Sequence, residues 1–241
     1  MDWNLVLILL IIFIATLIRS TFGFGDALFA MPFLAVIAGI KTATPLMALV
    51  GFTIALVILI KDYKKVEFKS ALRIIISSLI GIPVGLIFLK GVDENTIMLI
   101  LGILILIFSL NYLIKPTLLH LRSDKFAWIF GFTAGILGAA YNTNGPPVII
   151  FGTLRRWNPK NFRATLQGYF LPTGIMLITG HLIAGNITKT VITDYLFALP
   201  LILIAIWTGN VLNKKIPAGK FNIYIYSILL IISILLIIRS I

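Results

Sequence analysis

Two polar interruptions in long apolar stretches hold the residues of this sequence that are best suited to binding an anion. The first runs from Ser20 to Asp26, and Arg19 directly precedes it. A guanidinium presents a planar fork of donors that matches an oxyanion, and an ionisable group within a membrane segment is a functional candidate by default. We predict that Arg19 contacts an anion; the alternatives are a structural ion pair with Asp26 or a side chain that reaches an interface.

The other residues of the first interruption suggest how such a site would work. Asp26 is predicted to carry a coupling proton, with simple neutralisation of Arg19 as its alternative role. Gly23 and Gly25 belong to the predicted binding site, because a broken helix leaves free N–H groups that attract anions. The alternative is that these glycines only allow kinks or close packing of helices.

The second interruption, Tyr141–Pro147, offers neutral donors and acceptors in place of charges. Asn142, Thr143, Asn144 and Gly145 are predicted to line the same pocket from the opposite side. Irregular backbone at membrane depth persists only where protein buries it or where it lines a wet cavity. Capping of the interrupted helices is the alternative role for these polar side chains.

A third group of candidates follows the interruptions along the chain. Thr44 and Thr165 occupy equivalent places in two similar segments, and Gln167 lies close behind Thr165. We predict that all three contact the anion, although a buried threonine often bonds back to its own helix. Arg163 is either a determinant of topology or a gate beside the site, and His181 is expected near an interface.

The composition argues against several other functions. The chain has no cysteine and only two histidines, His120 and His181, so neither a metal site nor a cofactor is predicted. Nucleotide-binding loops and hydrolase motifs are missing, which argues against an enzyme. The net charge of +12 would suggest nucleic acid in a soluble protein. Here the basic residues cluster in short loops, as in membrane proteins, and no nucleic-acid partner is predicted.

The elements that must position these residues are hydrophobic helices. Hydrophobic residues make up 60% of the 241 residues and charged residues 12%, whereas soluble domains carry about 25% charged residues. The sequence therefore predicts an all-α polytopic protein whose partner is the lipid bilayer. Its apolar segments are expected at 3–20, 22–39, 43–60, 70–89, 96–114, 126–140, 145–154, 164–182, 193–212 and 221–239.

The segments also repeat in order. Gly23 and Pro32 match Gly138 and Pro147 at one constant offset, and the Thr44 and Thr165 segments match further along. We predict two transmembrane repeats, 1–114 and 115–241, each with a broken or re-entrant helix pair and three transmembrane helices. Such repeats are common in secondary transporters.

Loop charge predicts how the repeats lie in the membrane. Four basic regions are assigned to the cytoplasm by the positive-inside rule, which makes the repeats inverted and places both termini outside. Segment 126–154 is short for two full crossings, so a re-entrant hairpin would fit it. Segment 3–39 is longer and could be two true crossings. Full crossing and re-entry are left open for both segments. The four regions are marked by Lys61, Lys64, Lys65, Lys69 and Arg73; Lys115, Arg122 and Lys125; Arg155, Arg156, Lys160 and Arg163; and Lys214, Lys215 and Lys220.

At the two interruptions the chain resembles the sulfite exporter TauE/SafE family of membrane permeases. The resemblance covers nearly the whole chain as two copies of the family's repeat. Its residues are Phe22 to Pro32 in the first copy, then Gly131 to Gly138, Asn142 to Pro147 and Phe162 to Phe170. Membership implies transport of sulfur-containing anions such as sulfite, sulfonates and sulfoacetate, or of other small organic anions. The segments Asp26-Ala27 and Tyr141–Asn144 replace glycines that are usual in the family.

These observations together predict a secondary transporter for small anions. Sulfur-containing oxyanions or organosulfonates are the expected substrates, moved by alternating access with a proton as the expected coupling ion. An anion channel of the same fold and a non-transporting membrane accessory subunit remain as alternatives. The expected location is a prokaryotic plasma membrane, and a homodimer is left open.

Overall fold

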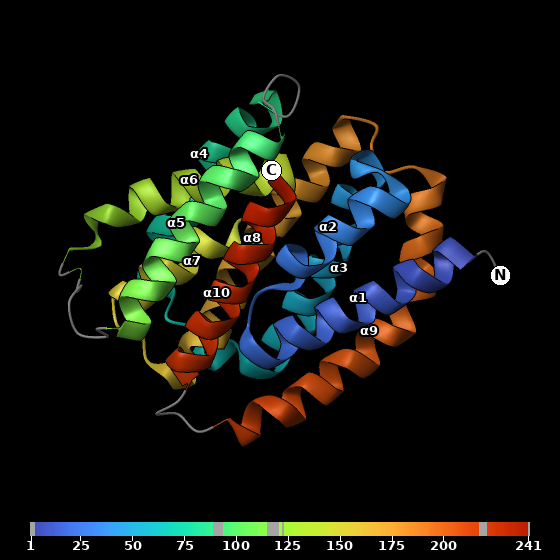
Figure 1. Cartoon of the computed structure of the whole chain (residues 1–241). Coiled ribbons are helices and arrows are strands. Elements are labelled where there is room, and N and C mark those ends of the chain that lie inside the picture. Colours follow the sequence, from blue (N-terminus) through green and yellow to red (C-terminus); the bar gives the residue numbers. More distant parts are fainter. Residues whose placement is uncertain (1–2, 89–93, 115–120, 122, 217–220, 241) are drawn as a thin grey trace.

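The structure is a computed structural model that describes residues 3–88, 94–114, 121, 123–216 and 221–240. Within these residues the chain forms helices joined by short turns, and no strand occurs. Figure 1 shows the helices gathered into one bundle, with the N-terminal end of α1 at the right-hand edge of the view and the C-terminal end of α10 near its upper middle. The predicted all-α class is confirmed for this part of the chain.

The described residues form one α-helix in each of the ten predicted apolar segments. Most helix ends agree with the predicted ends within a few residues, but α8 and α9 begin earlier, because their polar first turns continue the helix beyond the apolar run. The helices are α1 (Trp3–Phe22), α2 (Asp26–Ala38), α3 (Ile40–Asp62), α4 (Phe68–Phe88), α5 (Glu94–Ile114), α6 (Ala127–Tyr141), α7 (Gly145–Leu154), α8 (Pro159–Ile183), α9 (Lys189–Lys215) and α10 (Phe221–Ser240), with 3-10 turns η1 (Tyr63–Lys65) and η2 (Asp124–Phe126).

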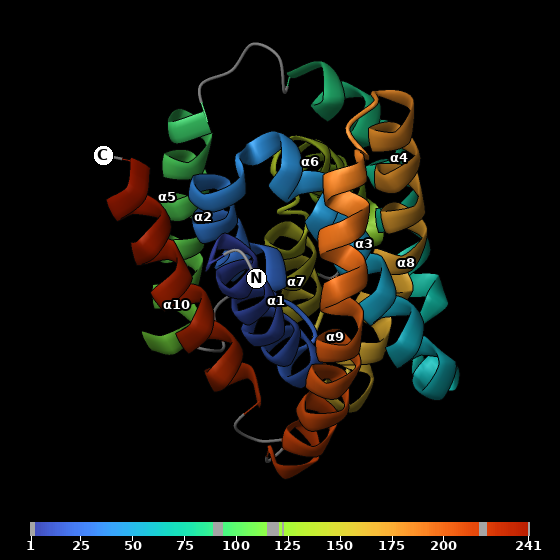
Figure 2. The same cartoon turned by 90° about the vertical axis from the view of Figure 1, so that its right-hand side faces the viewer.

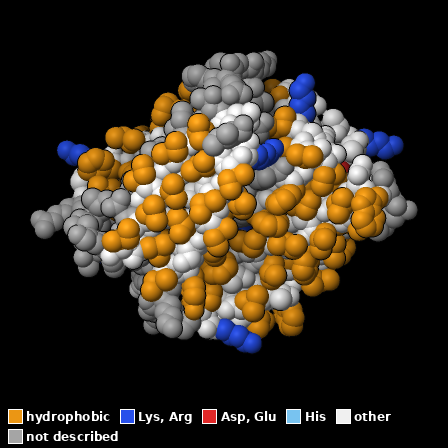
Figure 3. Space-filling model, viewed as in Figure 1, with side chains coloured by type: hydrophobic (Ala, Val, Ile, Leu, Met, Phe, Trp, Pro, Cys, Tyr) orange, Lys and Arg blue, Asp and Glu red, His pale blue; other side chains and the backbone are white. Residues whose placement is uncertain are grey.

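The outer surface of the bundle is suited to lipid. Among the described residues, the segments Trp3–Phe22, Ile40–Lys65 and Lys189–Lys215 are long and apolar enough to cross a membrane. Large apolar side chains such as Val36, Trp207 and Ile183 are 78%, 68% and 82% exposed. Figure 3 shows hydrophobic side chains covering one face, with Lys and Arg mostly toward its edge. A soluble monomer rarely exposes so wide an apolar surface.

The helices that lead into the two interruptions pack across the halves of the chain. Helix α1, which ends at the first interruption, lies along α9 from the second half. Helix α6, which ends at the second interruption, lies along α4 from the first half. Helix α3 packs on α8, and α5 packs on α10, as Figures 1 and 2 show. Each of these contacts therefore joins a helix of the first half of the chain to a helix of the second half.

Helices α4 and α6 approach so closely that glycine is required between them. A Cβ atom at Gly135 would lie 2.2 Å from the carbonyl oxygen of Ser78, and one at Gly81 would lie 2.3 Å from that of Phe132. The hydroxyl of Ser78 donates to the carbonyl of Gly131 at 2.7 Å. Small residues of this kind join helices in membranes, where hydrophobicity alone does not bring them together.

Three buried apolar clusters surround the middle of the bundle. One is formed mainly by α1, α2, α3 and α9, and it includes Met47. A second unites α4, α6, α7, α8 and α10 and includes Phe170. A small third cluster joins Ala48 on α3 to Leu177 on α8. Members of all three clusters line one pocket together with Arg19, Asp26, Asn142 and Asn144.

Candidate functional site

Within the first interruption, the break between helices is the three-residue turn Gly23-Phe24-Gly25, two of whose positions favour glycine. Helix α1 ends at Phe22, and α2 begins at Asp26. Gly23 and Gly25 have φ of 94° and 99°, in the left-handed region that disfavours residues with a Cβ. The turn brings Arg19, at the end of α1, within reach of Asp26, the first residue of α2. Asp26 also lies where a negative charge is favoured by the helix dipole.

Arg19 is the centre of a buried polar cluster. Its side chain is only 5% exposed, and its Nη1 atom lies 2.7 Å from Oδ2 of Asp26. Its Nε and Nη2 atoms donate to Oε1 of Gln167 at 3.2 and 3.0 Å. The ring of Phe170 lies 4.3 Å below the guanidinium carbon, a cation–π contact that gains strength when it is desolvated. The structural ion pair considered as an alternative is thus present in this conformation.

Gln167 connects this arginine to the backbone of the first interruption. Its Nε2 atom donates to the carbonyl oxygen of Gly23 at 2.8 Å, while its Oε1 atom accepts from Arg19. One fully buried carboxamide therefore links α8 both to the charged side chain and to the turn that presents it. A carboxamide suits this role because it donates and accepts at once.

The second interruption is built with asparagine and proline. Helix α6 ends at Tyr141, and Asn142 follows with φ of 56°, a left-handed conformation that asparagine tolerates. Its N–H donates to the carbonyl of Gly138 at 2.9 Å. Helix α7 begins at Gly145 and continues with Pro146 and Pro147. These prolines have no N–H, so hydrogen bonds to an anion at this end would come mainly from side chains.

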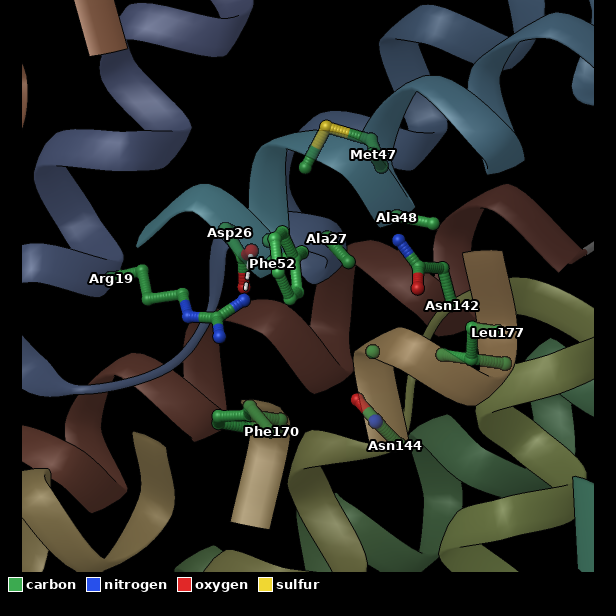
Figure 4. A pocket seen from close by; sticks show the side chains of 12 residues that line it. Arg19, Asp26, Ala27, Met47, Ala48, Phe52, Asn142, Asn144, Phe170 and Leu177 are labelled. Carbon is green, nitrogen blue, oxygen red and sulfur yellow. Dashed lines mark hydrogen bonds and ion pairs between the residues drawn. The ribbon is translucent and has the colours of Figure 1, made fainter. Parts of the chain in front are cut away.

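The two interruptions meet at one small, partly open cavity of about 30 Å³ lined mainly by buried residues, which is room for one or two water molecules. In Figure 4, Arg19 and Asp26 lie at one end of the cavity, and Asn142 and Asn144 lie toward the other. The remaining lining side chains are apolar apart from the glycine backbone. They are Ala27, Met47, Ala48, Gly51, Phe52, Phe170, Gly174 and Leu177. The cavity thus combines a charged end, an amide end and apolar walls.

Other predicted site residues lie outside this cavity and make structural contacts. The hydroxyl of Thr44 donates to Ile40 of its own helix at 2.8 Å. Thr165 accepts from the backbone N–H of Glu67 at 3.1 Å. Thr143 donates to the carbonyl of Leu137 at 3.4 Å, as a helix cap would. Their predicted contact with an anion has no support in this conformation and stays a prediction.

The glycines of the predicted site support it through the backbone. Gly23 supplies the carbonyl that Gln167 binds. Gly25 precedes the first residue of α2, and Gly145 is the first residue of α7 without lining the cavity. A Cβ atom at Gly138 would lie 2.9 Å from Cβ of Asn144, so this glycine makes room for the asparagine.

Several lining residues were not singled out from the sequence. Phe170, Gly174 and Leu177 follow Gln167 at intervals of three, four and three residues, which places all four on one face of α8. Gly51 and Phe52 come from α3, which packs on α8. The spacing after Gln167 could have indicated Phe170, whereas the α3 residues belong to an apolar run without a local signal.

The remaining polar candidates lie apart from the cavity. His181 is buried near the end of α8, where its Nδ1 atom lies 3.2 Å from the carboxamide nitrogen of Asn186. Arg155 donates to the carbonyl of Leu121 at 2.7 Å and pairs with Asp124 at 2.8 Å. Among the described residues, no group of three or more His, Asp or Glu side chains comes together. His120 lies outside the described residues.

Apolar helices of membrane length around a small polar cavity define a helical membrane protein with a central polar site. The family described as sulfite exporter TauE/SafE matches residues 8–236, so the chain belongs to this family of membrane transporters. The probable sulfite/organosulfonate exporter TauE of Cupriavidus necator is 23% identical over 201 residues, which cover 81% of this chain and 78% of that protein. No solved structure matches the chain. The predicted family is confirmed, and the chain is a transporter rather than an enzyme.

Proposed function

We propose that this protein is a secondary transporter that binds a small anion between its two chain interruptions and moves it by alternating access. Sulfur-containing oxyanions or organosulfonates such as sulfite or sulfoacetate are the proposed substrates. One observation carries the proposal: Arg19 and Asp26 from the first interruption share a small cavity with Asn142 and Asn144 from the second. The name of the relative from Cupriavidus necator supports the substrate class.

Arg19 is proposed to hold the anion by exchanging its partner. Its Nη1 atom now contacts Asp26 at 2.7 Å. The cavity of about 30 Å³ would have to widen to admit an oxyanion, which would then compete for the same N–H group. A sulfonate or sulfite oxygen accepts charge-assisted hydrogen bonds from a guanidinium as a carboxylate does. Asn142 and Asn144 would donate to the anion from the opposite end, and Phe170 would keep the guanidinium in place.

Asp26 is the proposed carrier of the coupling proton. An anion that replaces it beside Arg19 would leave a carboxylate in a site where it is only 6% exposed. A buried carboxylate without a partner favours its neutral form, so anion binding would draw a proton onto Asp26. Anion and proton would then cross together.

Alternating access is proposed to use two inverted repeats, 1–114 and 115–241. The support is the reciprocal packing, in which α1 lies along α9 as α6 lies along α4. The helix that leads into each interruption thereby packs on a helix of the other repeat. Rocking of one repeat against the other would therefore move both interruptions. Helices α6 and α7, with 15 and 10 residues, rise only about 22 and 15 Å at 1.5 Å per residue. Both helices are shorter than the hydrocarbon core of a bilayer, which is about 30 Å thick, and this supports a pair that enters the membrane and returns to the same side.

The proposed location is a prokaryotic plasma membrane, with both termini outside. The exposed Lys64 and Lys65 lie in η1, directly after α3, and Lys214 and Lys215 lie at the end of α9. These positions support one basic, cytoplasmic end of the bundle. Lys115, Arg122 and Lys220 lie outside the described residues. A homodimer stays a prediction.

Flux into proteoliposomes tests the transport proposal. Purified protein is reconstituted, and uptake of labelled sulfite or sulfoacetate is followed with and without an inward proton gradient. A saturable uptake that exceeds the equilibrium level when the gradient is present supports a proton-coupled transporter. Uptake that never exceeds equilibrium and does not saturate indicates a channel, and no binding or uptake of any anion indicates an accessory subunit.

A further inference from the structure

A second buried arginine lies one helical turn from the proposed anion site. Arg163 is on α8, four residues before Gln167, which places it about 6 Å closer to the start of the helix. Its side chain lies against the first interruption, because a Cβ atom at Gly23 would meet the Cγ and Cα atoms of Arg163 at 3.2 and 3.3 Å. The two arginines therefore border the same turn of the chain.

The charge of Arg163 is not balanced in the way that the charge of Arg19 is. Arg163 is only 8% exposed, and among the described residues no carboxylate forms an ion pair with it. Asp62 is near enough to interact with it electrostatically, but its carboxylate forms an ion pair with Lys65 instead. Its Nη2 atom donates to the side-chain oxygen of Asn210 on α9, while its Nε atom is buried without a partner. A buried cation with a neutral partner and an idle donor favours the approach of an anion.

Helix α9 closes over this arginine and the first interruption together. Gly209 faces Ser20, since a Cβ atom there would lie 2.5 Å from that of the serine. The carboxamide of Asn213 donates to the carbonyl of Thr21 at 2.6 Å. Helix α9 thus covers the end of α1 along the length from Gly209 to Asn213. We call this contact of α9 with the end of α1 the seal. It lies toward the basic end of the bundle, which α9 reaches at Lys214 and Lys215.

We propose that Arg163 is a second anion-binding residue of the transport path, held by Asn210 in this conformation and freed when α9 moves away from the first interruption. The inference rests on the proposed transport function and extends it to the passage between the Arg19 site and the basic end. An anion leaving or entering by that end would pass from one guanidinium to the next. The neutral Asn210 suits a reversible latch, because a carboxylate there would hold Arg163 more tightly.

Substitutions at Arg163 and Asn210 test the inference. Arg163→Gln is expected to lower the rate of sulfite or sulfoacetate flux about tenfold, the loss expected when a charged hydrogen-bond donor no longer meets its ligand. Equilibrium binding at the Arg19 cavity should fall less than the flux does, since that cavity is not lined by Arg163. Arg163→Lys keeps the charge and should recover most of the flux, and Asn210→Asp should slow the flux by locking the latch.

The outcomes separate this inference from the transport proposal. Wild-type flux in both Arg163→Gln and Asn210→Asp would overturn the role of Arg163 while leaving the Arg19 site in place. Equally low flux in Arg163→Gln and Arg163→Lys would also overturn it, because a role in packing alone does not depend on the charge. A wild-type protein that neither binds nor moves an anion would instead contradict the transport proposal.

The absence of cysteine from the chain permits a direct test of the latch. Ser20→Cys places a thiol under the seal, and Thr16→Cys places a matched buried thiol one turn away from it. In inside-out vesicles, Asn210→Ala should make the Ser20→Cys thiol react faster with a membrane-impermeant reagent without affecting the Thr16→Cys thiol. Equal reactivity with and without Asn210→Ala would contradict the latch.

Discussion

Gln167 accepts two hydrogen bonds from Arg19, at 3.2 and 3.0 Å, across 148 positions of the sequence. The contact joins α8 of the second half to the end of α1 in the first. The same carboxamide donates to the carbonyl of Gly23, so the position of the arginine and the shape of the turn depend on one side chain. Loss of this side chain should therefore affect both the stability of the fold and the binding of an anion.

Gln167→Leu should lower the free energy of unfolding by about 1–3 kcal/mol, because buried N–H and carbonyl groups lose their partner. Weaker binding of sulfite or sulfoacetate should accompany it. Thr173→Val is the matched control, since Thr173 is fully buried on the same helix and its hydroxyl donates to a carbonyl of that helix. Thermal unfolding in detergent, with and without anion, measures both effects. Equal behaviour of the two variants would argue against the bridging role of Gln167.

Gly51 and Gly174 give a test position and a matched control position for anion binding, because both line the cavity. A Cβ atom at Gly51 would lie 2.9 Å from Nη1 of Arg19, whereas one at Gly174 would meet its nearest neighbour at an ordinary 3.7 Å. We expect Gly51→Ala to weaken anion binding by about tenfold or more, equivalent to about 1.4 kcal/mol, and Gly174→Ala to have little effect. Equilibrium binding to the purified variants checks this. Comparable affinities would place the anion elsewhere.

Asp26→Asn should distinguish the two proposed roles of Asp26, which are competition with the anion for Arg19 and transfer of the coupling proton. The variant removes the carboxylate that now occupies Nη1 of Arg19, so anion affinity should rise, by about tenfold if one charged contact is released. Transport should at the same time stop responding to an imposed proton gradient, because asparagine does not take up a proton. The measurement is binding and gradient-driven flux on the same preparation. Flux that still responds fully to the gradient would remove Asp26 as the proton carrier.

The sequence was sufficient to predict the helices, the family and the two interruptions. Long apolar runs predict helices in a membrane because the backbone there must satisfy its own hydrogen bonds. Arg19 and Asp26 were identifiable because charges are rare in such runs. Gln167 was identifiable by its place beside Thr165 in a repeated segment, although its bridge to Gly23 depends on how α8 packs.

The residues that complete the cavity could not be predicted in the same way. Gly51 and Phe52 lie within an apolar run of α3, and only the packing of α3 on α8 brings them to Arg19. Thr44 and Thr165, by contrast, were predicted from the sequence but do not line the cavity. Their matching positions in the repeats suggested a site, yet the structure places Thr44 against its own helix and Thr165 against Glu67.

The close approach of α4 and α6 gives a prediction about stability alone. Gly135→Ala would place a Cβ atom 2.2 Å from a backbone oxygen of Ser78, and this contact requires the two helices to separate. Overpacking of this kind costs about 1–3 kcal/mol, and the denaturation temperature without anion should fall accordingly. Gly174→Ala serves as the control. An unchanged denaturation temperature for Gly135→Ala would contradict the tight packing of these helices.

Binding of an anion between the two interruptions at Arg19 can be tested with a charge-neutral double variant. Arg19→Gln combined with Asp26→Asn removes both charges together, so neither is left buried and alone. A ligand that binds the native state raises its denaturation temperature. We expect sulfite, sulfoacetate or a related anion to stabilise the wild-type protein but not the folded double variant. Equal stabilisation of both proteins would contradict the assignment of this cavity as the anion site.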